Sequence, residues 1–542
     1  MMKEQSKAFK GSSIAFFLAV IFCTLLLWFT IYRIMQHTNG MFSYVVDDAY
    51  IHMQIAKNLA FHGTWGINAG EFSSASSSLL YTVLLAGSFR LFGDSLYLPF
   101  LINAVAGLLL LFITWRWLVK HGVKPFSQLI ILILLILFTP LPLLIMTGME
   151  HTLQCLFSFL FLFSFADWIQ KNKETGLSTL KIPLPVLIYA VLTATIRYEG
   201  LFLVGMACLA LLYWRKIPTA FLLGIIAVIP LIIFGIYSVS KGSYFLPNSV
   251  LVKSEAAQFS AGGLLHAFGN ILAERLAFSK SGVALLTVQR LLLILPLTFL
   301  VFLKYSSVNR SFRFLLLALT GASFLQVTLA DTGKFYRYEG YLVFCSLAVI
   351  SLLVYRYGKD FFSVQTLLVK ALVLVISFFL FLPLVLRAIT ANAKLSRAGI
   401  NIYEQQYQMS RFLSSQYNNS IVAANDIGAI AYFTNSGIVD LWGLGDVDIA
   451  RSKKGGYWTS QFLDSVSRKK GASIAIVYDS WIDQSLPKEW KKAGEWKISN
   501  NVVCGDDHVS FYAIDSAGLT TLKNRLQLFQ PSLPATVSVT YE

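Results

Sequence analysis

Two adjacent carboxylates, Asp47 and Asp48, follow the first long apolar run of the chain, inside the stretch "MFSYVVDDAYIHMQIAKNL" (41–59). Apolar residues then recur at helical spacing as far as Gly63, so either aspartate could cap a helix that begins here. A pair of neighbouring acids has a property that a single acid lacks. Like-charge proximity and partial burial raise the pKa of one member toward the range of a general base. The pair therefore predicts a general base at the start of a helix.

A second acidic motif, "TGMEHT", brings Glu150 and His151 to the end of another apolar run. These two residues are too few to form a zinc site. Two interpretations stay open: an ordinary polar loop, and a role for both side chains in the same site as the aspartate pair.

The motif "RYEG" occurs twice, and each copy lies at the end of an apolar run. Its Arg and Glu could form an interfacial ion pair next to a Tyr anchor. Arg also offers a bidentate fork to a phosphate group. We predict that cationic residues at these boundaries bind a phosphate, and the residues concerned are Arg197, Lys253, Lys334 and Arg337, with Glu199 beside the first of them.

The composition indicates that these residues are positioned by membrane helices. The chain has 542 residues, of which 56% are hydrophobic and only 13% are charged, and its mean hydropathy is +0.64. This composition predicts several membrane spans. The formal net charge of +16 is explained by basic cytoplasmic loops rather than by nucleic-acid binding. Five scattered cysteines indicate neither a disulfide framework nor a metal site.

Apolar runs bounded by charged residues predict about eleven spans. Their limits are 14–33, 97–116, 127–146, 152–168, 183–196, 200–214, 217–238, 286–303, 312–330, 340–355 and 365–387. The first run is too long for the core of a signal peptide, so we expect it to remain as a span. With a cytoplasmic N-terminus, the basic loops then fall on the cytoplasmic side. This count treats 79–93 as an interfacial helix.

The predicted topology gathers the acidic and basic motifs outside the cytoplasm. Residues 34–96 form the first external loop, and the motifs at Glu150, Arg197 and Arg337 open to the same side. In the tail, 389–542, the runs "SIVAAN", "ASIAIVYD" and "VSFYAID" alternate with turn-rich segments. This pattern predicts a small α/β domain.

The expected reaction depends on where these groups lie. Nucleotide sugars and ATP are made in the cytoplasm, and the chain has neither a P-loop motif nor a Gly-x-Gly-x-x-Gly turn between a strand and a helix. An external carboxylate base beside a cationic site and lipid favours a donor that is itself a lipid phosphate. A polyprenyl-phosphate sugar fits, because its phosphate leaves as a stable anion and the acceptor hydroxyl needs a base.

Several segments also carry a family resemblance. They are "DDAYIHMQIAKNLAFHGTWGINAGE", "TGMEH", "IRYEG", "LPNSVLVKS" and "NDIGAIAYFTNSGIVDLWGLGD", in this order from about residue 45 to residue 450. Together they resemble the external segments of membrane glycosyltransferases of the GT-C superfamily, in particular mycobacterial terminal arabinofuranosyltransferases and their bacterial relatives. The chain departs from that pattern in a comparatively short tail and at Tyr198, where many relatives carry Pro.

The resemblance implies a polytopic α-helical membrane protein of GT-C-like type, with a catalytic transmembrane domain over 1–388 and an extracytoplasmic α/β domain over 389–542. It implies inverting transfer of a sugar from a polyprenyl-phosphate donor to an envelope glycan or lipid acceptor. The reaction would take place at the external face of a bacterial cytoplasmic (inner) membrane. Asp47 would be the general base, with Asp48 as its alternate or helper.

The remaining matched motifs, together with the segment "DTGKFYRYEG" (331–340), supply the other candidates for the site. Glu150 is a further catalytic candidate, and the substrate-binding candidates are His151, Arg197, Glu199, Asn248, Lys253, Lys334 and Arg337. The motifs assign no metal ligand and no certain cofactor, and a divalent metal is left open.

Two other functions are compatible with an outward-facing membrane protein. A transporter or flippase of lipid-linked sugars would carry ionisable residues within its spans, whereas the charges here stand at span ends. A polymerase or ligase acting on lipid-diphosphate glycans would be expected to use basic residues of a late, large loop. Release of polyprenyl phosphate during glycosylation of an acceptor distinguishes the transferase from these two other functions.

Overall fold

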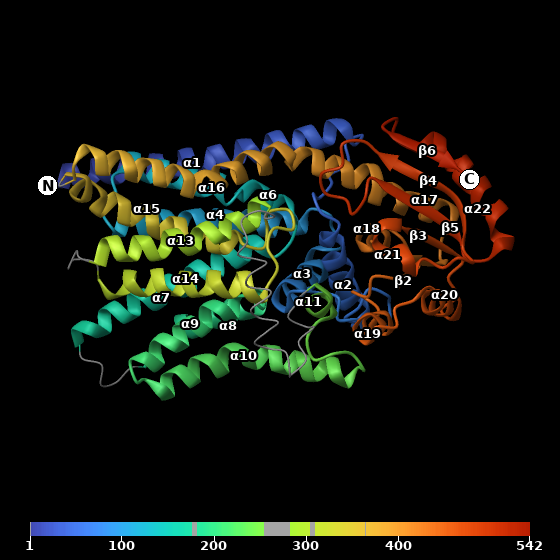
Figure 1. Ribbon diagram of the computed structural model, residues 1–542, viewed down its shortest axis with the longest axis horizontal. Helices are drawn as coiled ribbons and strands as arrows, with labels where there is room; N and C mark the ends of the chain where they lie inside the picture. Colours follow the sequence, from blue (N-terminus) through green and yellow to red (C-terminus); the bar gives the residue numbers. More distant parts are fainter. Residues whose placement is uncertain (1, 176–180, 254–281, 304–308, 364) are drawn as a thin grey trace.

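The computed structural model describes residues 2–175, 181–253, 282–303, 309–363 and 365–542. A bundle of long helices occupies one end of the elongated molecule, and a domain built on a β-sheet occupies the other (Figure 1). The long helix α16 (Leu367–Ile402) runs from the bundle into the sheet domain. The predicted domain limit at 388/389 therefore falls inside a continuous helix.

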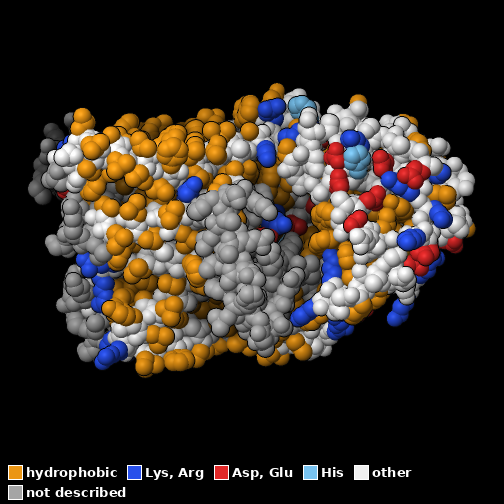
Figure 2. Space-filling view, viewed as in Figure 1, with side chains coloured by type: hydrophobic (Ala, Val, Ile, Leu, Met, Phe, Trp, Pro, Cys, Tyr) orange, Lys and Arg blue, Asp and Glu red, His pale blue; other side chains and the backbone are white. Residues whose placement is uncertain are grey.

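Eight helices of the described residues are long and apolar enough to cross a membrane. They are α1 (Met2–His37), α4 (Leu98–Lys120), α7 (His151–Thr175), α10 (Ile217–Ser240), α13 (Val283–Leu303), α14 (Arg310–Leu329), α15 (Gly340–Ser363) and α16. Apolar side chains cover the sides of this bundle, and Lys and Arg lie at the end that holds the N-terminus as well as around the C-terminal domain (Figure 2). The protein is thus a multi-pass helical membrane protein.

The expected count of eleven spans is not confirmed. Helices occupy the other three predicted segments, but they are short: α8 (Leu184–Ile196) has 13 residues and α9 (Gly200–Tyr213) has 14. At 1.5 Å per residue, each is about 20 Å long, less than the ~30 Å hydrocarbon core. The predicted span 127–146 is divided into α5 (Pro125–Phe138) and α6 (Leu141–Met146), because Pro140 and Pro142 interrupt its backbone hydrogen bonds.

Shorter elements lie between the bundle and the sheet domain. They are α2 (Asp48–His62), α3 (Leu79–Phe92) and α11 (Asn248–Lys253) (Figure 1). Helix α3 matches the short helix expected at 79–93. These elements come from chain segments that the sequence assigns to one side of the membrane, and they do meet at one end of the bundle.

The C-terminal domain is a mixed six-stranded sheet with the order β2-β1-β3-β5-β4-β6. The strands are β1 (Ile421–Ala424), β2 (Gly437–Asp440), β3 (Ile474–Val477), β4 (Lys491–Ile498), β5 (His508–Ala513) and β6 (Val537–Tyr541). β1 pairs in parallel with β2 and β3, and the other pairings are antiparallel. The three strands predicted from sequence are β1, β3 and β5, and all are confirmed.

Helices cover both faces of this sheet. They are α17 (Gln408–Gln416), α18 (Gly428–Phe433), α19 (Val447–Gly455), α20 (Ser460–Lys469), α21 (Asp479–Ile482) and α22 (Leu519–Phe529). Phe412 of α17 and Leu522 of α22 belong to the apolar core on one face, whereas Ile449 of α19 and Leu463 of α20 belong to that on the other. The predicted α/β character of the tail is confirmed.

Candidate active site

The two aspartates at the start of α2 have different partners. Helix α2 begins at Asp48 and ends at His62, and the next residue, Gly63, has a φ of 64° that lets its N–H bond the carbonyl of Asn58. This confirms the helix and its stop signal. Asp47 occupies the N-cap position, but its side chain makes no capping hydrogen bond to α2.

The Asp47 carboxylate caps a helix of the C-terminal domain instead. Its Oδ2 accepts a hydrogen bond of 2.6 Å from the N–H of Gly428, and its Oδ1 accepts one of 2.8 Å from Ala429. These residues begin α18, where free N–H groups favour an anion. Position 428 requires glycine, because a Cβ there would lie 2.2 Å from the backbone oxygen of Asp47.

A third acid, Asp426, adjoins Asp47 at this junction. It accepts hydrogen bonds from Nε2 of Gln406 at 2.9 Å and from the hydroxyl of Tyr478 at 3.0 Å. Burial and the neighbouring Asp426 carboxyl raise the pKa of Asp47 well above its usual value, and burial also raises the pKa of Asp426. The junction therefore favours one shared proton over two negative charges.

Asp48 contacts the helical bundle. Its Oδ2 forms an ion pair with Nη2 of Arg337, which lies in the loop before α15. The Asp48 side chain is 23% exposed, whereas Asp47 is 7% exposed. Nη1 of the same arginine donates to Sδ of Met149 at 3.2 Å. Asp48 is thus the member of the pair that joins the predicted cationic residues.

Glu150 is fully buried between α6 and α7 and pairs with the first "RYEG" motif. Its Oε1 accepts hydrogen bonds from Nη1 of Arg197 at 2.6 Å and from the Ser77 hydroxyl at 3.2 Å. Its Oε2 lies 3.5 Å from Nε2 of His52. Burial alone would raise the pKa of Glu150, but the charges of His52, His151 and Arg197 outweigh burial and hold that pKa well below its usual value. Glu150 is therefore an anion, and a poor general acid.

Tyr338 lies at the centre of these charges. Its ring centroid is 4.7 Å from the Arg197 guanidinium carbon and 5.4 Å from that of Arg337. His151 stacks on the same ring at 5.7 Å with an interplanar angle of 29°. Two guanidinium groups thereby lie close to one aromatic ring, whose faces attract cations.

Six of the sequence-predicted residues thus form one charged cluster around Tyr338. They are Asp48, Glu150, His151, Arg197, Glu199 and Arg337. Glu199 belongs to it through Nη2 of Arg197, which donates to its Oε1 at 2.6 Å. Asp47 does not belong to it.

The two "RYEG" copies differ in their ion pairs. In the second copy, Glu339 does not pair with Arg337 but with the fully buried Arg387 of α16. Arg387 also donates to the carbonyl of Tyr336, and Glu339 accepts from the N–H of Gly333 at 2.8 Å. These bonds fix the loop from which Arg337 extends.

An apolar cavity of about 270 Å³ adjoins the charged cluster. Its polar lining comes from Ser77, Arg197, Glu199, Ser249, Asp331 and Tyr338, and its apolar lining includes Leu201, Phe202, Leu246, Val250 and Leu329. We call it the Arg197 cavity. An aliphatic chain could occupy it while an anionic head contacts the guanidinium.

The remaining substrate-binding candidates have different surroundings. Asn248 is buried, its N–H donates to the carbonyl of Ser74 at 3.0 Å, and neither polar atom of its side chain has a hydrogen-bond partner among the described residues. Lys334 is 55% exposed and lies 3.6 Å from Asp331. Lys253 ends α11, and its side chain lies outside the described residues.

Sequence reasoning missed two members of the site and undervalued a third. His52 stands four residues after Asp48 on α2, a spacing that places both side chains on one helix face. Ser77 belongs to a Ser-rich loop, and no local sequence pattern predicts its contact with Glu150. From the sequence, Tyr338 is expected only to be an interfacial anchor.

Among the described residues, one group of three side chains could together hold a metal ion. Asp506, Asp507 and His508 have ligand atoms within 4.8 Å of one another. Nδ1 of His508 already bonds Oδ1 of Asp507 at 2.6 Å, and Ser480 donates to Asp506. This half-buried turn at the start of β5 lies outside the charged cluster.

Fold and site together define a multi-pass helical membrane protein with a charged cluster between its bundle and a C-terminal α/β domain. A family model described as a domain of unknown function (DUF8728) matches residues 399–512. The crystal structure of the apo oligosaccharyltransferase of Archaeoglobus fulgidus is similar, with a TM-score of 0.49 and 12% identity, over 94% of this chain and 78% of that one. No curated protein matches the chain.

Proposed function

We propose that this protein is a membrane glycosyltransferase that moves a sugar from a polyprenyl-phosphate donor to an envelope glycan or lipid acceptor. The observation that carries the proposal is the arrangement of Asp48, Arg337, Tyr338 and Arg197 beside the Arg197 cavity. A carboxylate, two guanidinium groups and an apolar cavity are what such a reaction needs in one place.

The donor phosphate is assigned to Arg197 and Arg337. Both are buried and keep their charge, because the adjacent acids outweigh burial and raise the pKa of each. Arg197 lines the cavity that would receive the first isoprene units. Glu150 and Glu199 hold its guanidinium in place, so the phosphate meets a preorganised cation.

Asp48 is the proposed general base, in preference to Asp47. Both oxygens of Asp47 accept backbone hydrogen bonds from α18, and the residue is buried. Asp48 is more exposed and belongs to the charged cluster. In the reaction, the acceptor oxygen forms a bond to the anomeric carbon with inversion and gives its proton to Asp48. The bond from that carbon to the phosphate oxygen breaks, and polyprenyl phosphate leaves.

The external face of a bacterial cytoplasmic membrane is the proposed location of this reaction. The proposal agrees with the basic residues of the short loops that the sequence places on the opposite side of the membrane, because basic residues favour the cytoplasmic side.

The decisive assay follows both products. The full-length protein is reconstituted with short-chain polyprenyl-phosphate sugars and a crude envelope-glycan acceptor, and released polyprenyl phosphate and glycosylated acceptor are quantified. A transferase gives both in equal amounts, and Asp48→Asn should form both about 10²- to 10⁴-fold more slowly. Movement of intact lipid-linked sugar across the bilayer without release of polyprenyl phosphate would identify a flippase and reject the proposal.

A further inference from the structure

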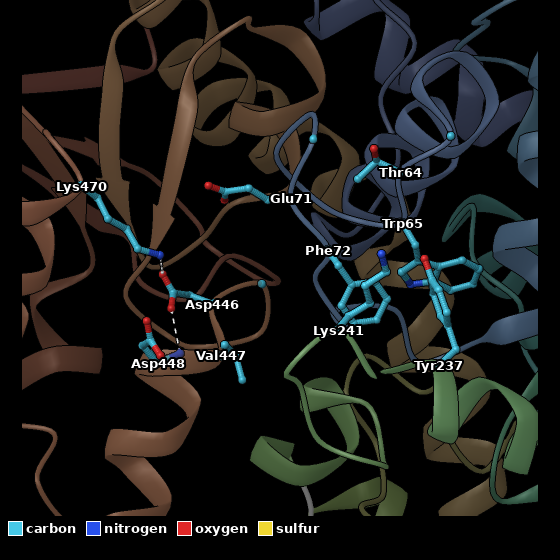
Figure 3. Close-up of a pocket in the computed structure, with 13 residues that line it drawn as sticks. Thr64, Trp65, Glu71, Phe72, Tyr237, Lys241, Asp446, Val447, Asp448 and Lys470 are labelled. Carbon is cyan, nitrogen blue, oxygen red and sulfur yellow. Dashed lines mark hydrogen bonds and ion pairs between the residues drawn. The ribbon is translucent and has the colours of Figure 1, made fainter. Parts of the chain in front are cut away.

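A second cavity, of about 430 Å³, lies between the loop after α2, the end of α10 and the C-terminal domain. The first loop contributes Trp65 and Phe72, α10 contributes Tyr237, and the C-terminal domain contributes Asp446 and Asp448 (Figure 3). We call it the Phe72 cavity. None of these residues belongs to the charged cluster.

Hydrogen bonds connect the three walls of the Phe72 cavity to one another. Nδ2 of Asn68 donates to the carbonyl of Ile438 at 3.0 Å, and Oδ1 of Asn68 accepts from the N–H of Ile438 at 2.9 Å. Arg451 of α19 donates to the carbonyl of Gly242, just after α10, at 2.5 Å. The cavity is therefore preformed, so that ligand binding would not have to supply the free energy of assembling it.

One wall of the cavity is aromatic. The rings of Phe72 and Tyr237 meet edge to face at a centroid distance of 5.3 Å. Trp65 lies behind them, 6% exposed and packed on Phe234 at 4.8 Å. Tyr237 lines the cavity and is 41% exposed, and the Lys241 ammonium lies 5.8 Å from its ring centroid. The negative face of such a ring attracts the weakly positive C–H groups on one face of a pyranose or furanose.

The opposite wall is polar and carries both signs of charge. Lys470 pairs with Asp446 at 2.5 Å, and the Asp448 side chain is 57% exposed. Glu71 extends from the first loop toward this wall, and Lys241 lies near the aromatic residues (Figure 3). Carboxylates accept and ammonium groups donate hydrogen bonds, so this pattern suits a ligand rich in hydroxyl groups.

The position of the cavity connects it with the charged cluster. Phe72 and Ser77 belong to one loop, and Ser77 donates to Glu150. The candidate span of α10 ends at Ser240, next to Tyr237 and Lys241, so the cavity lies at the membrane boundary. A saccharide bound there could extend along the loop toward Asp48.

We propose that the Phe72 cavity binds a sugar unit of the acceptor glycan, remote from the hydroxyl that is glycosylated. This inference rests on the proposed transferase function. It names the acceptor as a saccharide that is held both in the Phe72 cavity and near Asp48. Aromatic stacking gives affinity for the sugar face, and Glu71 and Asp448 select hydroxyl groups.

Binding of defined trisaccharides to the full-length protein tests this inference. Maltotriose, mannotriose and chitotriose serve as probes in saturation-transfer difference NMR, and Kd is measured for each one that binds. At least one should bind the wild type, and Phe72→Ala and Tyr237→Ala should each raise its Kd by roughly three- to tenfold. Glu71→Gln, which keeps the size of an exposed side chain, should also weaken it.

Tyr213→Ala is the matched control, because Tyr213 is 84% exposed and does not line the cavity. It should leave Kd unchanged. The inference is overturned if none of the three sugars binds, or if the Phe72, Tyr237 and Glu71 variants bind as the wild type does. Asp48→Asn should bind normally, so sugar binding without any transfer by the wild type would reject the transferase and keep the cavity as a saccharide site.

Discussion

Asp48 at the start of α2 is ion-paired with Arg337, which lies 289 residues further along the chain. Asp47, its immediate neighbour, is bonded to the N-terminus of α18 in the C-terminal domain. One pair of adjacent carboxylates therefore connects α2 both to the loop before α15 and to the C-terminal domain. The two positions should respond differently to the same substitution.

Asp48→Asn should lower turnover by about 10²- to 10⁴-fold, the usual cost of losing a general base, and should also reduce thermal stability, because the buried Arg337 loses its ion-pair partner. Asp47→Asn should mainly destabilise the protein, by roughly 1 kcal/mol, because an amide still accepts one of the two N–H bonds of α18. The measurements are release of polyprenyl phosphate and thermal unfolding of each purified variant. Full turnover by Asp48→Asn, together with an inactive but folded Asp47→Asn, would reverse the two roles.

Arg337→Ala should raise the apparent KM for the donor or lower kcat by tenfold or more. A charge-assisted contact is worth roughly 1.5–3 kcal/mol. Lys394→Ala is the control, since Lys394 is an exposed cation on α16 that does not line the Arg197 cavity. Steady-state kinetics over a range of donor concentrations distinguishes the two variants. Equal kinetics for both would remove Arg337 from the phosphate site.

The local parts of the structure could be predicted from the sequence. Helix α2 and its end at Gly63 follow from apolar spacing and a glycine stop, and β1, β3 and β5 follow from runs of β-branched residues. Strand β4 was missed because "KKAGEWKI" carries four charged residues among its eight. The short β2 was missed because "GIVD" is too brief to show a period.

The site could be predicted only as a set of candidate residues. Boundary position and charge selected Glu150, Arg197 and Arg337 correctly as neighbours, because the topology brings such ends together. The choice between Asp47 and Asp48 needed the tertiary structure, since it depends on α18 reaching Asp47. The pairing of Glu339 with Arg387, rather than with the nearby Arg337, is likewise invisible to sequence spacing.

Arg387→Leu should destabilise the protein by about 3–5 kcal/mol, because it leaves Glu339 buried without its partner. The turn that Arg387 supports has left-handed backbone at Lys334, Phe335 and Tyr336, with φ values of 41°, 62° and 61°, so it should rearrange when that support is lost. Left-handed backbone of this kind costs about 1–2 kcal/mol per residue.

Thermal unfolding in detergent measures the effect of Arg387→Leu, and Lys394→Leu is the control, an exposed cation on the same helix. Adding Glu339→Gln to Arg387→Leu should restore part of the stability, since the uncompensated charge is removed. If the double variant is no more stable than Arg387→Leu alone, the uncompensated charge of Glu339 is not the cause of the destabilisation.

The Asp47–Asp426 junction should make stability depend on pH. Burial and the facing carboxyl raise the folded-state pKa of Asp47 above the usual ~3.9. A raised acid pKa means that the folded state holds a proton that the unfolded state releases. This contribution to the free energy of unfolding is fully present below about pH 4 and is lost as pH rises through the raised pKa.

Asp426→Asn should remove that dependence, because its amide keeps an oxygen for Gln406 and offers N–H groups to an ionised Asp47. Thermal unfolding between pH 5 and pH 8 should then show a midpoint that falls with pH in the wild type and changes less in Asp426→Asn, with the variant more stable at pH 8. Asp448→Asn, at a side chain that is 57% exposed, should follow the wild type. Parallel curves for wild type and Asp426→Asn would mean that the two carboxyls carry separate charges and do not share a proton.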